Sequence, residues 1–132
     1  DGLGMRAARE NGLITAVISA KQSAPLERRL ADLGVRHAYL GVDAKRPVFE
    51  RLLSELGLTA GQVAYVGYDR IDLPVMCRVG VPIAVANAQS AVKAAACHIT
   101  QLAGGQVAVR EAIDWILSAR GDLDEAYRFL DA

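Results

Sequence analysis

Two carboxylates stand three residues apart after a short apolar run, in the segment Val63-Ala-Tyr-Val-Gly-Tyr-Asp-Arg-Ile-Asp72. A strand that ends in Gly-x-Asp-x-x-Asp points backbone amides and acidic side chains into the crevice beyond its carboxyl end, where α/β proteins bind phosphates and divalent cations. Asp69 and Asp72 are therefore candidate metal ligands, and phosphoryl chemistry is the hypothesis. Tyr68 counts against it, because a phenol that is neutral at pH 7 follows Gly67 where a carboxylate would be most useful.

Composition restricts the class of partner. Fifteen Lys and Arg balance fifteen Asp and Glu, so no overall field attracts nucleic acid or an anionic membrane. No apolar run approaches the roughly 20 residues of a membrane span. Cys77 and Cys97 lack metal-type spacing, and we expect small buried thiols rather than a disulfide. We expect a cytoplasmic protein with one domain over residues 1–132.

Strand and helix patterns alternate along the chain. Apolar runs predict strands at 13–19, 35–40, 63–66, 82–86 and 98–100. Amphipathic or capped stretches predict helices at 3–10, between Ser23 and Gly34, and at 47–56, 73–79, 90–96, 107–118 and 123–130. This alternation indicates an α/β fold with a parallel sheet and right-handed crossovers. Such sheets normally begin on a strand near their middle, and this chain opens on a helix, so we expect the first, central strand to be absent from residues 1–132.

Seven strings in order carry a family resemblance over nearly the whole chain. They are Asp1-Gly-Leu-Gly4, Ile18-Ser-Ala-Lys-Gln-Ser23, Gly41-Val-Asp-Ala-Lys45, Val63 to Met76, Val85-Ala-Asn-Ala88, Gly104 to Glu111 and Ile116 to Ala126. Together they resemble the 3-deoxy-D-manno-octulosonate 8-phosphate phosphatases, a cap-poor branch of the haloacid dehalogenase superfamily. The resemblance implies a Rossmannoid parallel sheet with helices on both faces, a Mg²⁺-dependent phosphomonoesterase, a small sugar-phosphate substrate and a homotetramer. It also implies that a strand ending in Asp-x-Asp-Gly, then a β-hairpin, would precede Asp1.

The same resemblance assigns roles to individual residues. Ser19 matches the family's phosphate-binding hydroxyl, and Lys45 matches the lysine that bridges nucleophile and phosphate, a role that suits a compact point charge. Asp69 and Asp72 match acids of the metal loop. The substrate-binding positions are Lys21, where the family usually has arginine, and Gly104, Gly105 and Arg110 of a carboxyl-terminal string that the resemblance places near a neighbouring subunit's active site.

Several positions depart from the family pattern. Tyr68 replaces the direct metal ligand, Ala20 a glycine of the phosphate loop, Asn87 an aspartate and Val107 the last glycine of the tail string. Mg²⁺ prefers charged oxygens in near-octahedral geometry, so a phenol is a poor substitute. No Asp-x-Asp-Gly nucleophile string occurs in residues 1–132. We therefore expect at most half a metal site and no phosphatase activity by the family mechanism.

Two classes of function remain open. One is a sugar-phosphate phosphatase whose catalytic strand is missing from this chain. The other is a non-catalytic phosphatase-like domain that acts in oligomerisation, similar to the one appended to vertebrate acylneuraminate cytidylyltransferases, where the metal loop is also altered. A dinucleotide-binding domain is a poor alternative, because Gly2-Leu-Gly4 follows no strand and lacks the third glycine of the fingerprint.

Structural roles compete with the functional ones at several positions. Ser19 could satisfy backbone groups at a strand end, Lys45 could be a solvated residue of a first helical turn, and Asp72 could be a helix N-cap. His98 and His37 are interpreted as core-edge or surface residues rather than bases. Trp115 and Met76 fall at helical core positions and are interpreted as packing residues.

Overall fold

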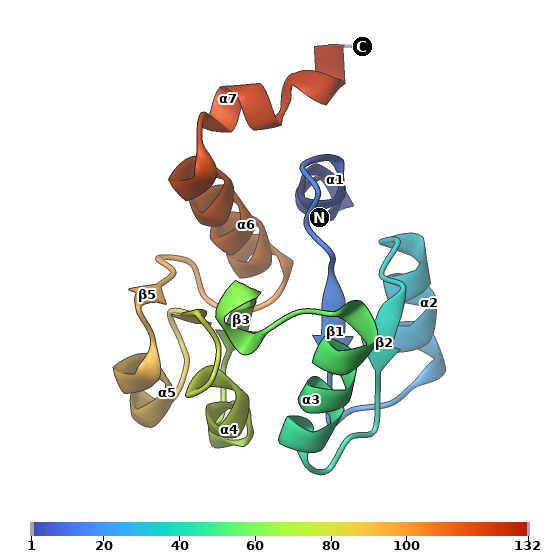
Figure 1. The fold of residues 1–132 in the computed structure, drawn as a ribbon, viewed down its shortest axis with the longest axis vertical. Coiled ribbons are helices and arrows are strands. Elements are labelled where there is room, and N and C mark those ends of the chain that lie inside the picture. Colours follow the sequence, from blue (N-terminus) through green and yellow to red (C-terminus); the bar gives the residue numbers. More distant parts are fainter. Residues whose placement is uncertain (1, 132) are drawn as a thin grey trace.

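A computed structural model describes residues 2–131 as alternating strands and helices (Figure 1). The strands are β1 (Ala16–Ile18), β2 (His37–Tyr39), β3 (Ala64–Gly67), β4 (Val81–Ala84) and β5 (His98–Ile99). The helices are α1 (Gly2–Glu10), α2 (Ala24–Asp32), α3 (Lys45–Leu56), α4 (Leu73–Met76), α5 (Ser90–Ala95), α6 (Gln106–Arg120) and α7 (Leu123–Ala126), with 3₁₀ turns at Ala60–Gln62, Arg70–Asp72 and Arg128–Asp131. The predicted α/β class is confirmed.

The strands pair in parallel, but in two separate sheets. β1 pairs with β2, so that Val17 lies opposite Ala38. The second sheet has the order β3-β4-β5, with Val66 opposite Ile83. In residues 2–131 no strand joins β1 to β3, and the edge of each that is turned away from its partner has no ladder. The predicted parallel pairing is therefore confirmed, while in residues 2–131 the sheet is divided between β1 and β3.

Local signals set the helix boundaries. The Ser23 Oγ accepts a hydrogen bond from the Leu26 N–H at 3.2 Å and caps α2, as predicted. Gly57 ends α3 in the left-handed region, with φ of 67°. The predicted helix at 73–79 is shorter in the structure: α4 ends at Met76, turn-type hydrogen bonds continue to Val79, and the Gly80 N–H then donates to the Ala60 carbonyl as the chain enters β4. The predicted helix at 123–130 breaks at Tyr127 into α7 and a 3₁₀ turn.

Three clusters form the core. The first joins the β4 region to α4, α5 and α6 through Met76, Ala84, Val85, Ala88, Val92 and Ala108. The second joins α1, α6 and α7, and Figure 1 shows α1 and α6 close together above the sheets. The third packs α3 against α4 through Phe49, Val75 and Val79. Met76 is 1% exposed, which agrees with its predicted packing role, and a buried side chain of this size contributes about 1.5–3 kcal/mol.

Two predictions about burial are wrong. Cys77 and Cys97 are free thiols, but both are exposed, since they lie in the turns that follow the short helices α4 and α5. The predicted buried strand at 13–19 is ordered as a strand only at 16–18, and Ala16 is exposed there. β1 is incompletely covered: no residue of the strand is fully buried, and Val17 borders a pocket described below. None of the helices in residues 2–131 is long and apolar enough to cross a membrane.

Candidate functional site

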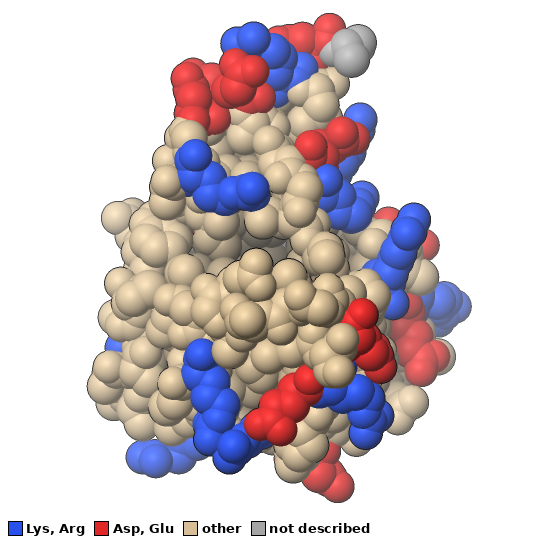
Figure 2. Space-filling view, viewed as in Figure 1, with Lys and Arg blue, Asp and Glu red and all other residues tan. Residues whose placement is uncertain are grey.

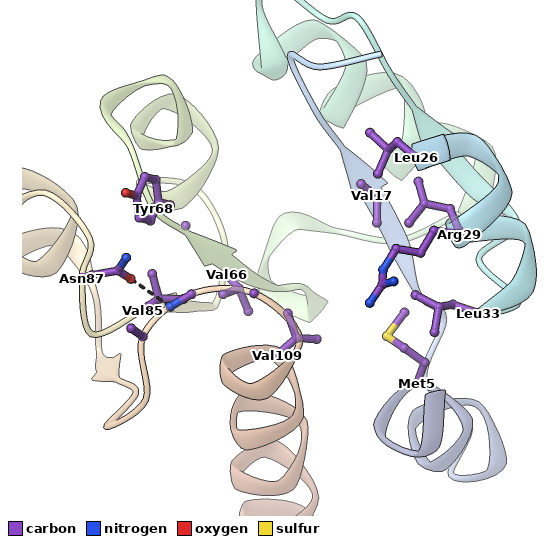
Figure 3. Close-up of a pocket in the computed structure, with 15 residues that line it drawn as sticks. Met5, Val17, Leu26, Arg29, Leu33, Val66, Tyr68, Val85, Asn87 and Val109 are labelled. Atoms are coloured by element: carbon purple, nitrogen blue, oxygen red, sulfur yellow. Dashed lines mark hydrogen bonds between the residues drawn. The ribbon is translucent and has the colours of Figure 1, made fainter. Parts of the chain in front are cut away.

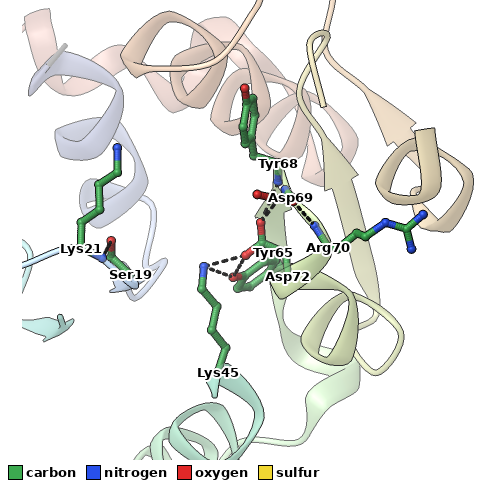
Figure 4. A network of polar contacts seen from close by, with 8 residues as sticks. All are labelled: Ser19, Lys21, Lys45, Tyr65, Tyr68, Asp69, Arg70 and Asp72. Atoms are coloured by element: carbon green, nitrogen blue, oxygen red, sulfur yellow. Dashed lines mark hydrogen bonds and ion pairs between the residues drawn. The ribbon is translucent and has the colours of Figure 1, made fainter. Parts of the chain in front are cut away.

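Lys45 and Asp72 are 27 residues apart in the sequence and form a buried ion pair. Lys45 is the first residue of α3, and Asp72 ends the 3₁₀ turn that follows β3. The Lys45 Nζ lies 2.6 Å from the Asp72 Oδ1, and the two side chains are 10% and 7% exposed (Figure 4). Lys45 is thus in a first helical turn, but it is not the solvated residue of the structural interpretation.

Asp72 uses both carboxylate oxygens inside the protein. Its Oδ1 accepts from Lys45 and, at 2.6 Å, from the Tyr65 hydroxyl. Its Oδ2 accepts from the backbone N–H groups of Tyr68 and Asp69, at 2.8 and 3.1 Å. Burial opposes ionisation, yet the hydrogen bonds from Lys45, Tyr65 and the two amides outweigh it and hold the pKa of Asp72 below its ordinary value. Asp72 occupies the N-cap position of α4, but its side chain bonds the turn before it rather than the helix after it.

Tyr65 is a member of this network that the sequence analysis did not single out. Its hydroxyl donates to Asp72 and lies 3.3 Å from the Lys45 Nζ. Burial, and then the hydrogen bond and charge of Asp72, raise the pKa of Tyr65, so the phenol is protonated at neutral pH. The sequence did contain a signal: side chains alternate along a strand, so Tyr65 lies on the same face as Gly67, at the end of β3 where the acidic turn begins.

Gly67 allows the turn to fold back closely on β3. A Cβ at this position would clash with the Met76 Sδ and would lie 3.2 Å from the Asp72 Cβ. Both neighbours are buried, and interiors are packed too densely for them to move aside freely. Gly67 therefore brings the Asp72 carboxylate within reach of the strand end, where the Tyr68 N–H donates to it.

The acidic turn does not fit a Mg²⁺ ion as it stands. Asp72 has both oxygens engaged by four donors, and the Asp69 Oδ1 accepts from the Arg70 N–H at 2.6 Å. Tyr68 is 50% exposed, and its side chain offers a single phenol oxygen where a carboxylate would offer two. Within the described part of the chain, no group of three or more His, Cys, Asp or Glu side chains is arranged to hold a metal. Mg²⁺ requires several oxygen ligands in octahedral geometry, so these residues form at most a partial site.

Ser19 and Lys21 lie in the loop that follows β1. The Ser19 N–H donates to the Tyr39 carbonyl at 2.9 Å, and its Oγ accepts from the Lys21 N–H at 3.1 Å. The Ser19 hydroxyl therefore satisfies a backbone group directly after the end of β1, as the structural interpretation proposed. Lys21 is exposed, and Figure 4 shows its side chain pointing away from the Lys45 network. The structure thus joins Lys45 to the acidic turn, while Ser19 and Lys21 stand apart on the β1 side.

A pocket of about 650 Å³ lies between β1 and β3. Figure 3 shows Val17 and Leu26 on one side of it and Val66, Val85 and Val109 on the other. Its remaining lining residues are Met5, Arg29, Leu30, Leu33, Gly67, Tyr68, Asn87, Ala103, Gly104 and Gly105. In the view of Figure 2 the molecule is hollowed near its middle, and the surface around the hollow is largely uncharged.

Two predicted substrate-binding glycines are at the polar end of this pocket. The Gly104 N–H donates to the Asn87 Oδ1 at 2.9 Å, and Gly105 follows it at the N-cap of α6. Tyr68 lines the same pocket. Arg110 does not line it: on α6 it pairs with Asp114 at 3.3 Å and lies over the Tyr127 ring at 5.2 Å. Within one chain, Arg110 therefore joins α6 to α7.

Residues 43–113 match the family model of the haloacid dehalogenase-like hydrolases. Among characterised proteins, the chain is 43% identical over 126 residues to a 3-deoxy-D-manno-octulosonate 8-phosphate phosphatase of Escherichia coli, covering 96% of this chain and 67% of that one. Its counterpart from Haemophilus influenzae is 40% identical over 133 residues, covering 98% of this chain and 74% of the relative.

Solved structures give the same likeness. A probable YrbI family phosphatase of Pseudomonas syringae superposes with a TM-score of 0.93 at 44% identity, covering 99% of this chain and 74% of that one. The 3-deoxy-D-manno-octulosonate 8-phosphate phosphatase of Moraxella catarrhalis, solved in complex with magnesium, phosphate and KDO, superposes with a TM-score of 0.86 at 36% identity, covering 89% of this chain and 68% of that one.

Proposed function

Because the chain belongs to the 3-deoxy-D-manno-octulosonate 8-phosphate phosphatases among the haloacid dehalogenase-like hydrolases, we propose that it binds the phosphate of such a sugar phosphate but does not hydrolyse it unaided. The position of Lys45 carries this proposal. Its ammonium is held 2.6 Å from Asp72 at the carboxyl end of β3, where parallel α/β proteins bind their ligands.

The described residues suit phosphate binding better than metal-assisted hydrolysis. A compact ammonium can donate to a phosphoryl oxygen as a point charge, and Ser19 supplies a hydroxyl at the end of β1, in the other sheet. Gly104 and Gly105 border the pocket where the sugar would extend. The family resemblance, rather than the geometry of one chain, assigns Lys21 and Arg110 to substrate as well. The acidic turn does not form a complete Mg²⁺ site, because both oxygens of Asp72 already accept hydrogen bonds within the protein.

The expected lack of unaided hydrolysis rests on the acidic turn of the described residues. By the family resemblance, Tyr68 stands in place of the carboxylate that would complete the metal loop. Phosphoryl transfer depends mainly on positioning and on charge stabilisation of the phosphoryl oxygens, and both are reduced here. The proposal includes a homo-oligomer, tetrameric by resemblance to the family, and a cytoplasmic location.

A second candidate function is a phosphatase-like domain that acts in oligomerisation. Exposed apolar side chains favour it: Leu102 and Val107 are 48% and 57% exposed on either side of the Gly104-Gly105 turn. Apolar side chains that gather on a surface often mark contacts between chains. On this alternative, Tyr68 stands in a metal loop that has lost its catalytic role.

Calorimetric titration with 3-deoxy-D-manno-octulosonate 8-phosphate and with inorganic phosphate tests the proposal. We expect both to bind, and we expect Lys45→Ala to weaken binding by roughly ten-fold or more, the loss typical of one charge-assisted hydrogen bond. Lys93→Ala, which changes a lysine on α5, is the matched control and should bind as the parent does. With Mg²⁺ present, neither the chain nor Tyr68→Asp should hydrolyse p-nitrophenyl phosphate faster than buffer. Absence of binding, or turnover that persists through repurification, contradicts the proposal.

A further inference from the structure

We propose that Tyr65 is a positioning residue whose hydroxyl fixes the direction of the Lys45 ammonium, and thereby the point at which a phosphoryl oxygen can meet it. The inference rests on the proposed function for the role of Lys45, but the geometry that it describes can be tested without any ligand. Neither the sequence pattern nor the family resemblance assigns a role to Tyr65. Its hydroxyl acts on the site through its hydrogen bonds with Lys45 and Asp72.

The three side chains form a closed triangle. The Tyr65 hydroxyl lies 2.6 Å from the Asp72 Oδ1 and 3.3 Å from the Lys45 Nζ, and the Lys45 Nζ lies 2.6 Å from the same Oδ1 (Figure 4). A hydroxyl has one proton to donate, and Asp72 receives it, so the oxygen lone pairs are directed to the ammonium. Two of the three ammonium protons thus have partners in residues 2–131. The third defines the direction in which Lys45 can bind an incoming oxygen.

Tyr65 is better anchored than the residue it orients. It lies on β3 in register with Pro82 of β4, and its ring packs against two of the core clusters. Lys45 reaches the site on a flexible four-carbon stem from the start of α3, and such a side chain loses substantial rotamer entropy when it is held. The packed Tyr65 ring therefore holds its hydroxyl at a fixed place relative to β3, and this hydroxyl orients the flexible Lys45 side chain.

Removal of the hydroxyl alone tests this role. Tyr65→Phe keeps the ring and its packing but takes one partner from Lys45 and one from Asp72. The matched control is Tyr39→Phe on β2, which removes a hydroxyl that also donates to a carboxylate, the Glu55 Oε2 at 3.1 Å, at an exposed site. Thermal unfolding of both variants, followed by circular dichroism, verifies that each is folded at the temperature of the assay.

Lysine acetylation at fixed pH, read by peptide mass spectrometry, reports the state of the ammonium. The chain has three lysines, Lys21, Lys45 and Lys93, so two internal references are present in each sample. In the parent chain we expect Lys45 to react most slowly, because its side chain is 10% exposed. In Tyr65→Phe the rate at Lys45 relative to Lys93 should rise roughly three- to ten-fold, as expected for the loss of one hydrogen bond, and in Tyr39→Phe it should not change.

The outcomes separate this inference from the proposed function. A Lys45 rate in the parent chain equal to that of the exposed Lys21, or an unchanged ratio in folded Tyr65→Phe, overturns the positioning role. If the ratio rises as expected, inorganic phosphate is then added to the parent chain. Protection of Lys45 by phosphate supports both proposals, whereas a risen ratio without protection supports the positioning role and contradicts phosphate binding.

Discussion

The Lys45 ammonium and the Asp72 carboxylate meet at 2.6 Å with their side chains only 10% and 7% exposed, which sets this pair apart from the other ion pairs around it. One residue along the chain, Arg46 pairs with Glu50 at 2.8 Å, but those side chains are 52% and 55% exposed. The adjacent residues Lys45 and Arg46 therefore form one ion pair that is removed from water and one whose attraction water weakens.

Lys45→Met should destabilise the protein by about 3 kcal/mol, because Asp72 would keep a buried charge without its cation. Arg46→Met is the matched control and should cost less than about 0.5 kcal/mol, the contribution of an exposed pair on one helix face. Urea unfolding followed by circular dichroism measures both. Equal losses for the two variants would show that the buried pair has no special weight.

Acid should reveal the contribution of Asp72 to stability. The pKa of Asp72 is lowered in the folded chain, so its contribution is present above the ordinary carboxyl pKa of about 4 and is lost as pH falls through the lower folded value. In that window the unfolded chain binds more protons, and the free energy of unfolding therefore rises with pH. Asp72→Asn should flatten this acid limb, whereas Asp43→Asn, at an exposed carboxylate, should preserve it. Parallel pH curves for the two variants would contradict the assignment to Asp72.

Gly67→Ala should cost about 1–3 kcal/mol, the range typical of overpacking, because the new methyl group meets Met76 and crowds the Asp72 side chain. Gly121→Ala is the control: nothing lies within 4 Å of a Cβ there, and its φ of 170° is extended backbone open to any residue. We expect the control to unfold within about 0.5 kcal/mol of the parent. A stable Gly67→Ala variant with the parent's acid limb would show that the turn can relax around a side chain.

The sequence predicted the element order well, because each element carries its own local signal. Ser23 and Gly57 mark helix ends through backbone hydrogen bonding and a left-handed φ, which depend on neighbours a few residues away. Burial was predicted less well at Cys77 and Cys97, because exposure in a turn depends on what packs above it. The segment after Met76 leaves the predicted helix at 73–79 as turns, and its Gly80 N–H bonds to the distant Ala60 carbonyl, a contact that no local pattern encodes.

In the candidate site too, residues with a local sequence signal were predicted, and residues that depend on the fold were not. Asp72 was singled out by the acidic turn after an apolar run and Lys45 by the family resemblance, and the structure places the two side chains together. Tyr65 was missed, since a tyrosine inside an apolar run is typical of any strand and only the fold brings its hydroxyl to a lysine 20 residues away. Ser19 and Lys21 are not joined to that network. They follow β1, whereas the network follows β3, and a pocket lies between these two strands.

The division of the sheet should make the isolated chain associate with itself. β1 and β3 each have an edge with no strand partner in residues 2–131, and Val17 and Val66 border the pocket between them. Unpaired strand edges beside apolar side chains recruit other chains through backbone hydrogen bonds. Size exclusion with light scattering at low micromolar concentration should therefore show species larger than a monomer. Val17→Lys should reduce them, because a charged side chain blocks an edge, while Ile99→Lys, on the outer strand β5, should have little effect. A sharp monomer peak with cooperative unfolding would show that the two sheets are stable as they stand, and a stronger effect of Ile99→Lys would place the contact on β5 instead.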